Sequence, residues 1–249
     1  GARGDGEGSD RALEALRRFF EDARGYRAAR EARGEGQPGD ARLEAMIPVL
    51  ARERPLIVHA NLVEEIRAAV GFAVEQGASL VIHGGYDAPL CAPLLKKHGI
   101  PVIVAGVYRL PLHGSDPYDH AFTLPARLRE AGVDFAISSM GQRGASQVRN
   151  RPYHAAMAAA FGLPLHDALK AITLSPARIL GVEARVGSLE PGKDATLIVT
   201  DGDPLETRTA VQMAFVRGRK VDLSDRHKRL WAKYRGKYRQ LREFREAKF

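Results

Sequence analysis

The sequence predicts an α/β fold built on a parallel sheet. Four apolar runs of the β type recur along the chain, and the stretches between them repeat apolar residues with the period of a helix. The runs cover residues 56–58, 80–82, 100–106 and a segment from 133 that ends around 138–140. Strands that alternate with helices are typical of parallel sheets with both faces covered. We therefore expect functional residues at the carboxyl edge of the sheet, where such folds hold ligands and metals.

Two helices are predicted before the first strand. Ser9 or Asp10 can cap a helix through residues 11–31, because either side chain can accept a hydrogen bond from a free amide of the first turn. Asp40 can cap a second helix, which Pro48 should bend. Each helix carries an apolar stripe, so we expect both to pack against the rest of the fold.

One helix links the first two strands, and both strands end at a histidine. The helix repeats Ile66, Val70 and Val74 on one face. A right-handed crossover from strand to helix to strand directs His59 and His83 out of the same rim. Two imidazoles on one rim suit a divalent metal ion. The alternative is a structural role for each histidine, held by hydrogen bonds.

The remaining elements are predicted from the same periodicities. Helices are expected over residues 61–78, 86–99, 121–131 and 151–162, with a pair broken at Pro176 over residues 163–182. The period then changes to that of strands, which are expected over residues 195–200 and 211–218, after turns at 191–194 and 201–204. We expect three parts: residues 1–183, residues 184–222 and residues 223–249.

The last of these parts is a basic amphipathic helix. One side of it carries five apolar or aromatic residues: Leu230, Trp231, Tyr234, Tyr238 and Leu241. We expect this side to pack against the rest of the protein while the Arg and Lys side chains stay solvated. The alternative is binding to nucleic acid or to an anionic membrane surface.

Composition excludes several classes of site and partner. Cys91 is the single cysteine, so an internal disulfide and a thiolate zinc site are excluded, and any metal must use nitrogen and oxygen ligands. No apolar run is long enough to predict a transmembrane segment. The net charge is +8, but residues 220–249 hold 11 Lys and Arg against 4 Asp and Glu. The α/β part is therefore nearly neutral, and nucleic acid is not expected as its partner.

Four strands are fewer than the eight that close a (β/α)8 barrel. From these residues alone, the chain forms either a small open sheet or the second half of such a barrel. The chain begins with Gly1 and shows no export signal before the first helix. We expect a preceding portion to be missing, which leaves the compartment unknown.

A family resemblance favours the barrel. Residues 166–206, HDALKAITLSPARILGVEARVGSLEPGKDATLIVTDGDPLE, resemble the carboxyl-terminal signature of the amidohydrolase superfamily, especially its imidazolonepropionase-like branch. The match continues through PLIVHA, LVIHGG, PVIVAG and VDFAISS and covers roughly residues 40–220. It implies the second half of a metal-dependent (β/α)8 TIM-type barrel, strands 5 to 8, followed by part of a small β-sandwich and the amphipathic helix.

The resemblance also implies which residues bind metal. His59 falls on the ligand position after the fifth strand of the barrel, and His83 on the position after the sixth. The family's HxH pair and carboxylated lysine have no counterpart in this chain. Met140 stands where the family has an aspartate after the eighth strand, and a thioether cannot shuttle a proton at neutral pH. No catalytic residue is therefore assigned.

The resemblance implies a hydrolase that acts on a non-peptide C–N bond of a small amide or cyclic amide. Water activated by a divalent metal ion, expected to be zinc, would attack that bond. The alternative, which Met140 favours, is a catalytically degenerate protein of the same fold with a binding or structural role. A small-molecule substrate is the expected partner, and a homo-oligomer stays open.

For the other polar residues, the predictions concern substrate contact, helix capping and exposure at the surface. His113 and Asp116, in the loop after the third strand, share the rim with Ser139, and we expect these three to contact substrate. Asp87 is expected to cap a helix. The remaining histidines of this region are expected at the surface: His120, His154 and His166.

Overall fold

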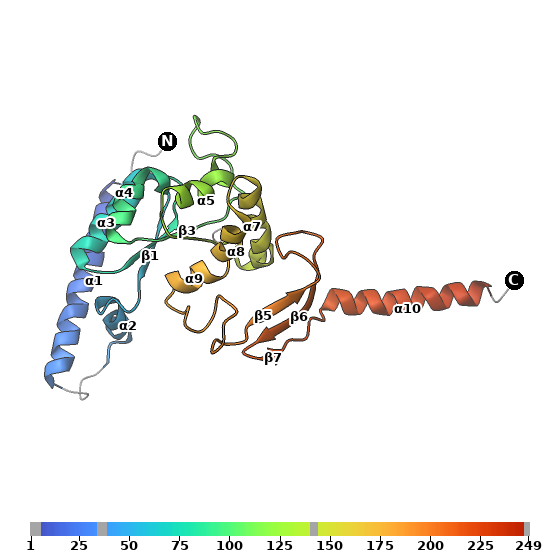
Figure 1. The fold of residues 1–249 in the computed structure, drawn as a ribbon. Helices are drawn as coiled ribbons and strands as arrows, with labels where there is room; N and C mark the ends of the chain where they lie inside the picture. Colours follow the sequence, from blue (N-terminus) through green and yellow to red (C-terminus); the bar gives the residue numbers. More distant parts are fainter. Residues whose placement is uncertain (1–5, 34–38, 140–143, 247–249) are drawn as a thin grey trace. The chain divides into compact units, whose positions relative to one another are not determined.

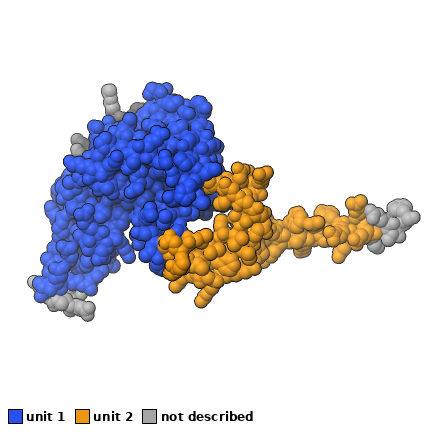
Figure 2. Space-filling model, in the orientation of Figure 1, with its two compact units in different colours: residues 1–188 blue, residues 189–249 orange. Residues whose placement is uncertain are grey.

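The computed structural model describes residues 6–33, 39–139 and 144–246. The chain divides into two compact units, residues 1–188 and residues 189–249 (Figure 2). The first unit contains a parallel sheet with its helices, and the second contains an antiparallel sheet followed by a long helix (Figure 1).

A four-stranded parallel sheet organises the first unit. Its strands lie in chain order: β1 (Leu56–Ala60), β2 (Leu80–Gly84), β3 (Val102–Val104) and β4 (Phe135–Ile137). Each neighbouring pair runs parallel, with Val58 beside Ile82 and Ile82 beside Val102. The predicted α/β fold with a parallel sheet is therefore confirmed.

Helices precede and separate these strands, as the periodicities predict. They are α1 (Gly6–Arg33), α2 (Ala41–Leu50), α3 (Val63–Gln76), α4 (Ala92–His98), α5 (His120–Glu130), α6 (Gly144–Gln147), α7 (Arg151–Ala160), α8 (Leu165–Ala171) and α9 (Leu174–Ile179), with 3-10 turns η1 (Ala88–Cys91) and η2 (Val148–Asn150). The helices after each strand return the chain to the amino edge of the sheet, so every strand runs in the same direction.

Asp40 caps α2 as predicted, whereas the cap predicted for α1 is wrong. Asp40 Oδ1 accepts hydrogen bonds from the amide of Arg42, at 2.9 Å, and from that of Leu43, at 3.4 Å. By contrast, α1 begins at Gly6, so Ser9 and Asp10 lie inside it. Adding residues to an existing helix costs far less than nucleating one, so the long helical run extends past both candidate caps.

The buried face of α3 differs slightly from the predicted one. Ile66 and Val70 are 0% and 2% exposed, but Val74 is 54% exposed. Each step of four residues drifts by about 40° on a helix with 3.6 residues per turn, so the third position of the series turns toward solvent. Ala73, 3% exposed, takes its place in the core.

The break between α8 and α9 lies before the proline, not at it. α8 ends at Ala171 and α9 starts at Leu174, so Pro176 is the third residue of α9. A proline is tolerated in the first turn because the amide that it lacks has no partner within the helix.

The second unit consists of a small antiparallel sheet and a basic helix. The strands β5 (Leu197–Thr200), β6 (Val211–Val216) and β7 (Arg219–Lys220) lie in the order β5-β6-β7. The helix α10 (Arg226–Glu246) follows them. The strands predicted over residues 195–200 and 211–218 are therefore present, as β5 and β6.

The parallel sheet is open at β1. Ile57 is 54% exposed, although Val81, its partner in the register, is 2% exposed. Within the described part of the chain, the four strands form an open sheet and not a closed barrel. Membership of a barrel therefore stays a proposal.

His154 lies in the core, so its predicted surface position is wrong. It is 3% exposed, and its Nδ1 accepts a hydrogen bond from the amide of Val107 at 3.1 Å. This bond joins α7 to the loop after β3 and requires an unprotonated Nδ1. Burial lowers the pKa of His154 below its usual value of 6.5.

We expect acid to destabilise the protein partly through His154. Because its pKa is lower in the folded chain, the unfolded chain binds more protons as the pH falls below 6.5, and the free energy of unfolding decreases. Denaturant titrations at about pH 7.5 and about pH 5.5 measure this loss. In His154→Asn, whose amide oxygen keeps an acceptor near Val107, the loss should be smaller. An equal loss in both proteins would contradict the assignment.

Candidate metal centre at the carboxyl edge of the sheet

His59 and His83 lie side by side on neighbouring strands. The parallel register pairs one directly with the other, and their ring centroids are 5.4 Å apart with the ring planes at 55°. Each is the last residue but one of its strand, so both stand at the carboxyl edge of the sheet. The fold thus brings together two histidines that are separated by a whole helix in the sequence.

The two imidazoles have different surroundings. His59 is exposed, whereas His83 is half-buried. Burial lowers the pKa of His83, and the positive charge on a protonated His59 lowers it further. His83 is therefore neutral at pH 7 and keeps the free lone pair that a metal ligand needs.

This pair fits two nitrogen positions of a metal site. Across residues 6–33, 39–139 and 144–246, no three His, Cys, Asp or Glu side chains are grouped so as to hold a metal ion. Met140, at the expected aspartate position, lies outside the described residues. Zinc usually takes three or four protein ligands, so metal binding by this pair of histidines stays a prediction.

Hydrogen bonds tie the loop after β1 to the loop after β2, beside the histidines. The amide of Gly85 donates to the carbonyl of Ala60, and the amide of Asp87 donates to that of Asn61, both at 2.8 Å. Gly84 has a φ of +114°, and a Cβ there would lie 2.8 Å from Asn61 Oδ1. Glycine is therefore required at this position by the backbone conformation and by the close packing.

Asp116 fixes the loop between β3 and α5. Its Oδ2 accepts hydrogen bonds from the Tyr86 hydroxyl, at 2.6 Å, and from the amide of His113, at 3.0 Å. The hydrogen bond from Tyr86 is the main cause of the lowered pKa of Asp116. Tyr86 is fully buried, and its hydroxyl also accepts a hydrogen bond from the amide of Leu112 at 3.1 Å. Asp116 thus anchors this loop to a buried side chain.

Asp87 faces a histidine and does not cap a helix. It precedes η1 without any side-chain capping bond, and its Oδ1 lies 3.2 Å from His113 Nε2. His120 is also not at the surface: it stacks on Tyr86, with ring centroids 4.4 Å apart. Both predictions are wrong because the partners come from loops distant in sequence. His166, in contrast, is exposed as predicted.

Ser139 is the third residue for which substrate contact is predicted. It follows β4 and is 9% exposed, and its neighbour Ser138 donates a hydrogen bond to the carbonyl of Val104 at 3.1 Å. His113 and Asp116 lie in the loop after β3, also at the carboxyl edge. Contact of these three residues with substrate stays a prediction.

Arg109 is a rim residue that the sequence did not single out. Its Nη1 donates to Asn61 Oδ1 at 3.2 Å, and its guanidinium lies 4.9 Å from the centre of the Tyr86 ring. Burial lowers the pKa of Arg109. Among the described residues, no carboxylate lies within ion-pair distance of it. A charged residue inside the apolar stretch IVAGVYRLPL was the available signal.

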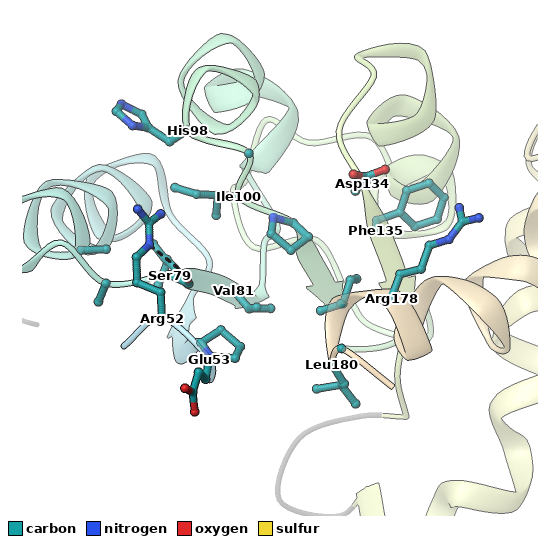
Figure 3. Close-up of a pocket in the computed structure, with 18 of the residues that line it drawn as sticks. Arg52, Glu53, Ser79, Val81, His98, Ile100, Asp134, Phe135, Arg178 and Leu180 are labelled. Atoms are coloured by element: carbon teal, nitrogen blue, oxygen red, sulfur yellow. Dashed lines mark hydrogen bonds between the residues drawn. The ribbon is translucent and has the colours of Figure 1, made fainter. Parts of the chain in front are cut away.

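A hollow of 640 Å³ lies at the opposite edge of the sheet (Figure 3). It is lined by residues that precede the strands, among them Ser79, Pro101 and Asp134. Arg52 donates a hydrogen bond to Ser79 Oγ there at 3.5 Å. Ligands of parallel α/β sheets bind at the carboxyl ends of strands, so this hollow is not the candidate site.

Comparison with known proteins gives relatives that include imidazolonepropionases. An imidazolonepropionase from Micrococcus luteus is 34% identical over 156 residues, which are 58% of this chain and 38% of the relative. An imidazolonepropionase from Rhizorhabdus wittichii is 30% identical over 155 residues, which are 59% of this chain and 36% of the relative. The chain therefore spans little more than a third of the length of these relatives.

Solved structures share the fold. The crystal structure of an amidohydrolase from Thermotoga maritima is 30% identical, with a TM-score of 0.74 over 84% of this chain and 55% of that one. An adenosine deaminase from Xanthomonas campestris with bound zinc is 21% identical, with a TM-score of 0.51 over 82% of this chain and 55% of that one. The model of the amidohydrolase family matches residues 52–222. The resemblance predicted from the motifs is confirmed, and the chain belongs to the amidohydrolase family.

Proposed function

We propose that the chain is part of a hydrolase that cleaves a non-peptide C–N bond in a small amide or cyclic amide. The observation that carries this proposal is the in-register pair of His59 and His83 at the carboxyl edge of a parallel sheet, in a chain of the amidohydrolase family. In the same proposal, the sheet is strands 5 to 8 of a (β/α)8 barrel.

His59 and His83 would hold a divalent ion, with zinc as the expected metal, through their ring nitrogens. Such an ion lowers the pKa of a bound water and polarises a carbonyl group. The chain's own contribution is to fix the protonation and the position of the two histidine ligands. Burial keeps His83 unprotonated, the register sets the separation of the rings, and the joined loops after β1 and β2 hold the rim in place.

Arg109 would orient the substrate by pairing with an anionic group on it. The guanidinium is half-buried at the rim, and its partners among the described residues are neutral: the Asn61 amide oxygen and the Tyr86 ring. A partly desolvated cation without a counter-charge gains more from an anionic ligand than an exposed one does. The substrate would therefore carry a carboxylate or a similar group near its scissile amide.

A second candidate is a binding or structural protein that has lost hydrolysis. Met140 favours it, because it stands where the family has the aspartate that binds metal and moves a proton. The two candidates differ in whether the histidine pair retains a metal ion.

We expect purified protein to contain a divalent metal ion, and His59→Ala combined with His83→Ala to lose it. Removing both nitrogens leaves the described rim without a ligand pair. Elemental mass spectrometry measures the metal content per chain. His98→Ala is the matched control, because His98 is exposed at the opposite edge of the sheet. Met140→Asp should raise the metal affinity. Metal retained by the double variant would contradict the site, and metal absent throughout would favour the binding protein.

We expect Arg109→Ala to raise KM for an anionic amide by roughly 10- to 100-fold, the worth of one hydrogen bond to a charged group. The turnover number kcat should change little, because the contact would be made in the ground state as well as the transition state. Steady-state kinetics on paired amides, with and without a carboxylate, measure both constants. Arg129→Ala is a matched control, since Arg129 pairs with Asp167. An equal rise in KM for the neutral amide would exclude charge pairing.

A further inference from the structure

The helix α10 carries an exposed aromatic stripe and an excess of positive charge. Residues 226–246 contain nine Arg and Lys and only two Glu. The α10 stripe is defined by five residues, which are 37%, 62%, 47%, 66% and 43% exposed in the order Leu230, Trp231, Tyr234, Tyr238 and Leu241. The stripe and its charges are not used by the proposed hydrolysis.

The cations are arranged on both sides of the stripe. At about 100° per residue, Lys233 and Lys237 fall along one margin, and Arg235, Arg239 and Arg242 fall along the other. The guanidinium of Arg235 lies 4.8 Å from the centre of the Trp231 ring. Each apolar side chain of the stripe is therefore within reach of a long basic side chain.

We propose that α10 binds flat on a membrane surface that contains anionic phospholipids. Tryptophan and tyrosine pair an apolar ring with a polar tip, and this combination places them at the boundary between headgroups and acyl chains. Arginine and lysine at the margins extend their charged ends toward phosphate groups while their stems stay near the apolar layer. Among the described helices, none is long and apolar enough to cross a bilayer, so the contact is made at the surface.

The arrangement fits a lipid surface better than a nucleic acid. A helix that binds a groove presents its cations toward the phosphates and usually packs its apolar side against its own fold. In α10, the exposed aromatic residues lie between the cations, so both groups face the same partner. Of the two partners, only an anionic membrane has charged headgroups above an apolar layer, so only it complements the cations and the aromatic residues at once.

Trp231 is the single tryptophan of the chain and therefore reports directly on α10. The whole chain is mixed with phosphatidylcholine vesicles, with or without phosphatidylserine. With phosphatidylserine, we expect Trp231 emission to shift to the blue, its quenching by acrylamide to fall, and the protein to float with the vesicles. Phosphatidylcholine alone should produce none of these changes. No shift with either vesicle would overturn the proposal.

Two variants and a control separate the contributions. Changing Arg235, Arg239 and Arg242 to Gln should weaken vesicle binding roughly a hundredfold, because each cation near an anionic surface adds about fivefold. Tyr234→Ala with Tyr238→Ala, which leaves the tryptophan reporter in place, should weaken it at least tenfold. Gln240→Ala, opposite the stripe, should bind as the unmodified chain does, and circular dichroism checks the helix in each protein. Full binding by either multiple variant, binding to duplex DNA in place of vesicles, or self-association through α10 without vesicle binding would overturn the proposal.

Discussion

The parallel register of β1 against β2 is the constraint on which the candidate site depends. It places His59 opposite His83. Just beyond the ladder, the amides of Gly85 and Asp87 donate hydrogen bonds to the carbonyls of Ala60 and Asn61 and so join the two loops. Side chains in a strand alternate between the two faces, so a slip of one residue would turn one histidine to the other side of the sheet. Leu80, Val81 and Ile82 of β2 are all buried, so this strand is covered on both faces of the sheet.

A second layer of polar contacts fixes the rim around this ladder. Tyr86 is central to it: its hydroxyl binds Asp116, its ring stacks on His120, and the guanidinium of Arg109 lies over the same ring. Asp116 and Arg109 come from the segment between β3 and α5, and His120 is the first residue of α5. One buried aromatic residue therefore determines where that loop lies and where its charges point. A loop held by a buried anchor keeps polar groups positioned without the entropic loss of ordering them at each binding event.

Much of this architecture follows from local patterns, and the rest requires the folded structure. Apolar runs ending at His59 and His83 predicted both strands and their shared edge, because strand periodicity and crossover handedness are local rules. The buried position of His154 and the pairing of Asp87 with His113 depend on residues 47 and 26 positions away. No short window of sequence contains such a pair. Arg109 likewise meets its described partners, Asn61 and Tyr86, only in the folded structure.

The open face of the sheet limits what the histidine pair can do on its own. His59 is exposed on the edge strand, next to Ile57 at 54% exposure, so water competes for any ligand bound there. Hydrolysis at a metal centre needs a shaped cavity with restricted water, in which charges interact strongly. Barrel strands beside β1 would supply that cover and would bury Ile57 at the same time. In the barrel that we propose, a strand beside β1 would thus cover the exposed apolar side chain of Ile57 and shield the histidine pair from water.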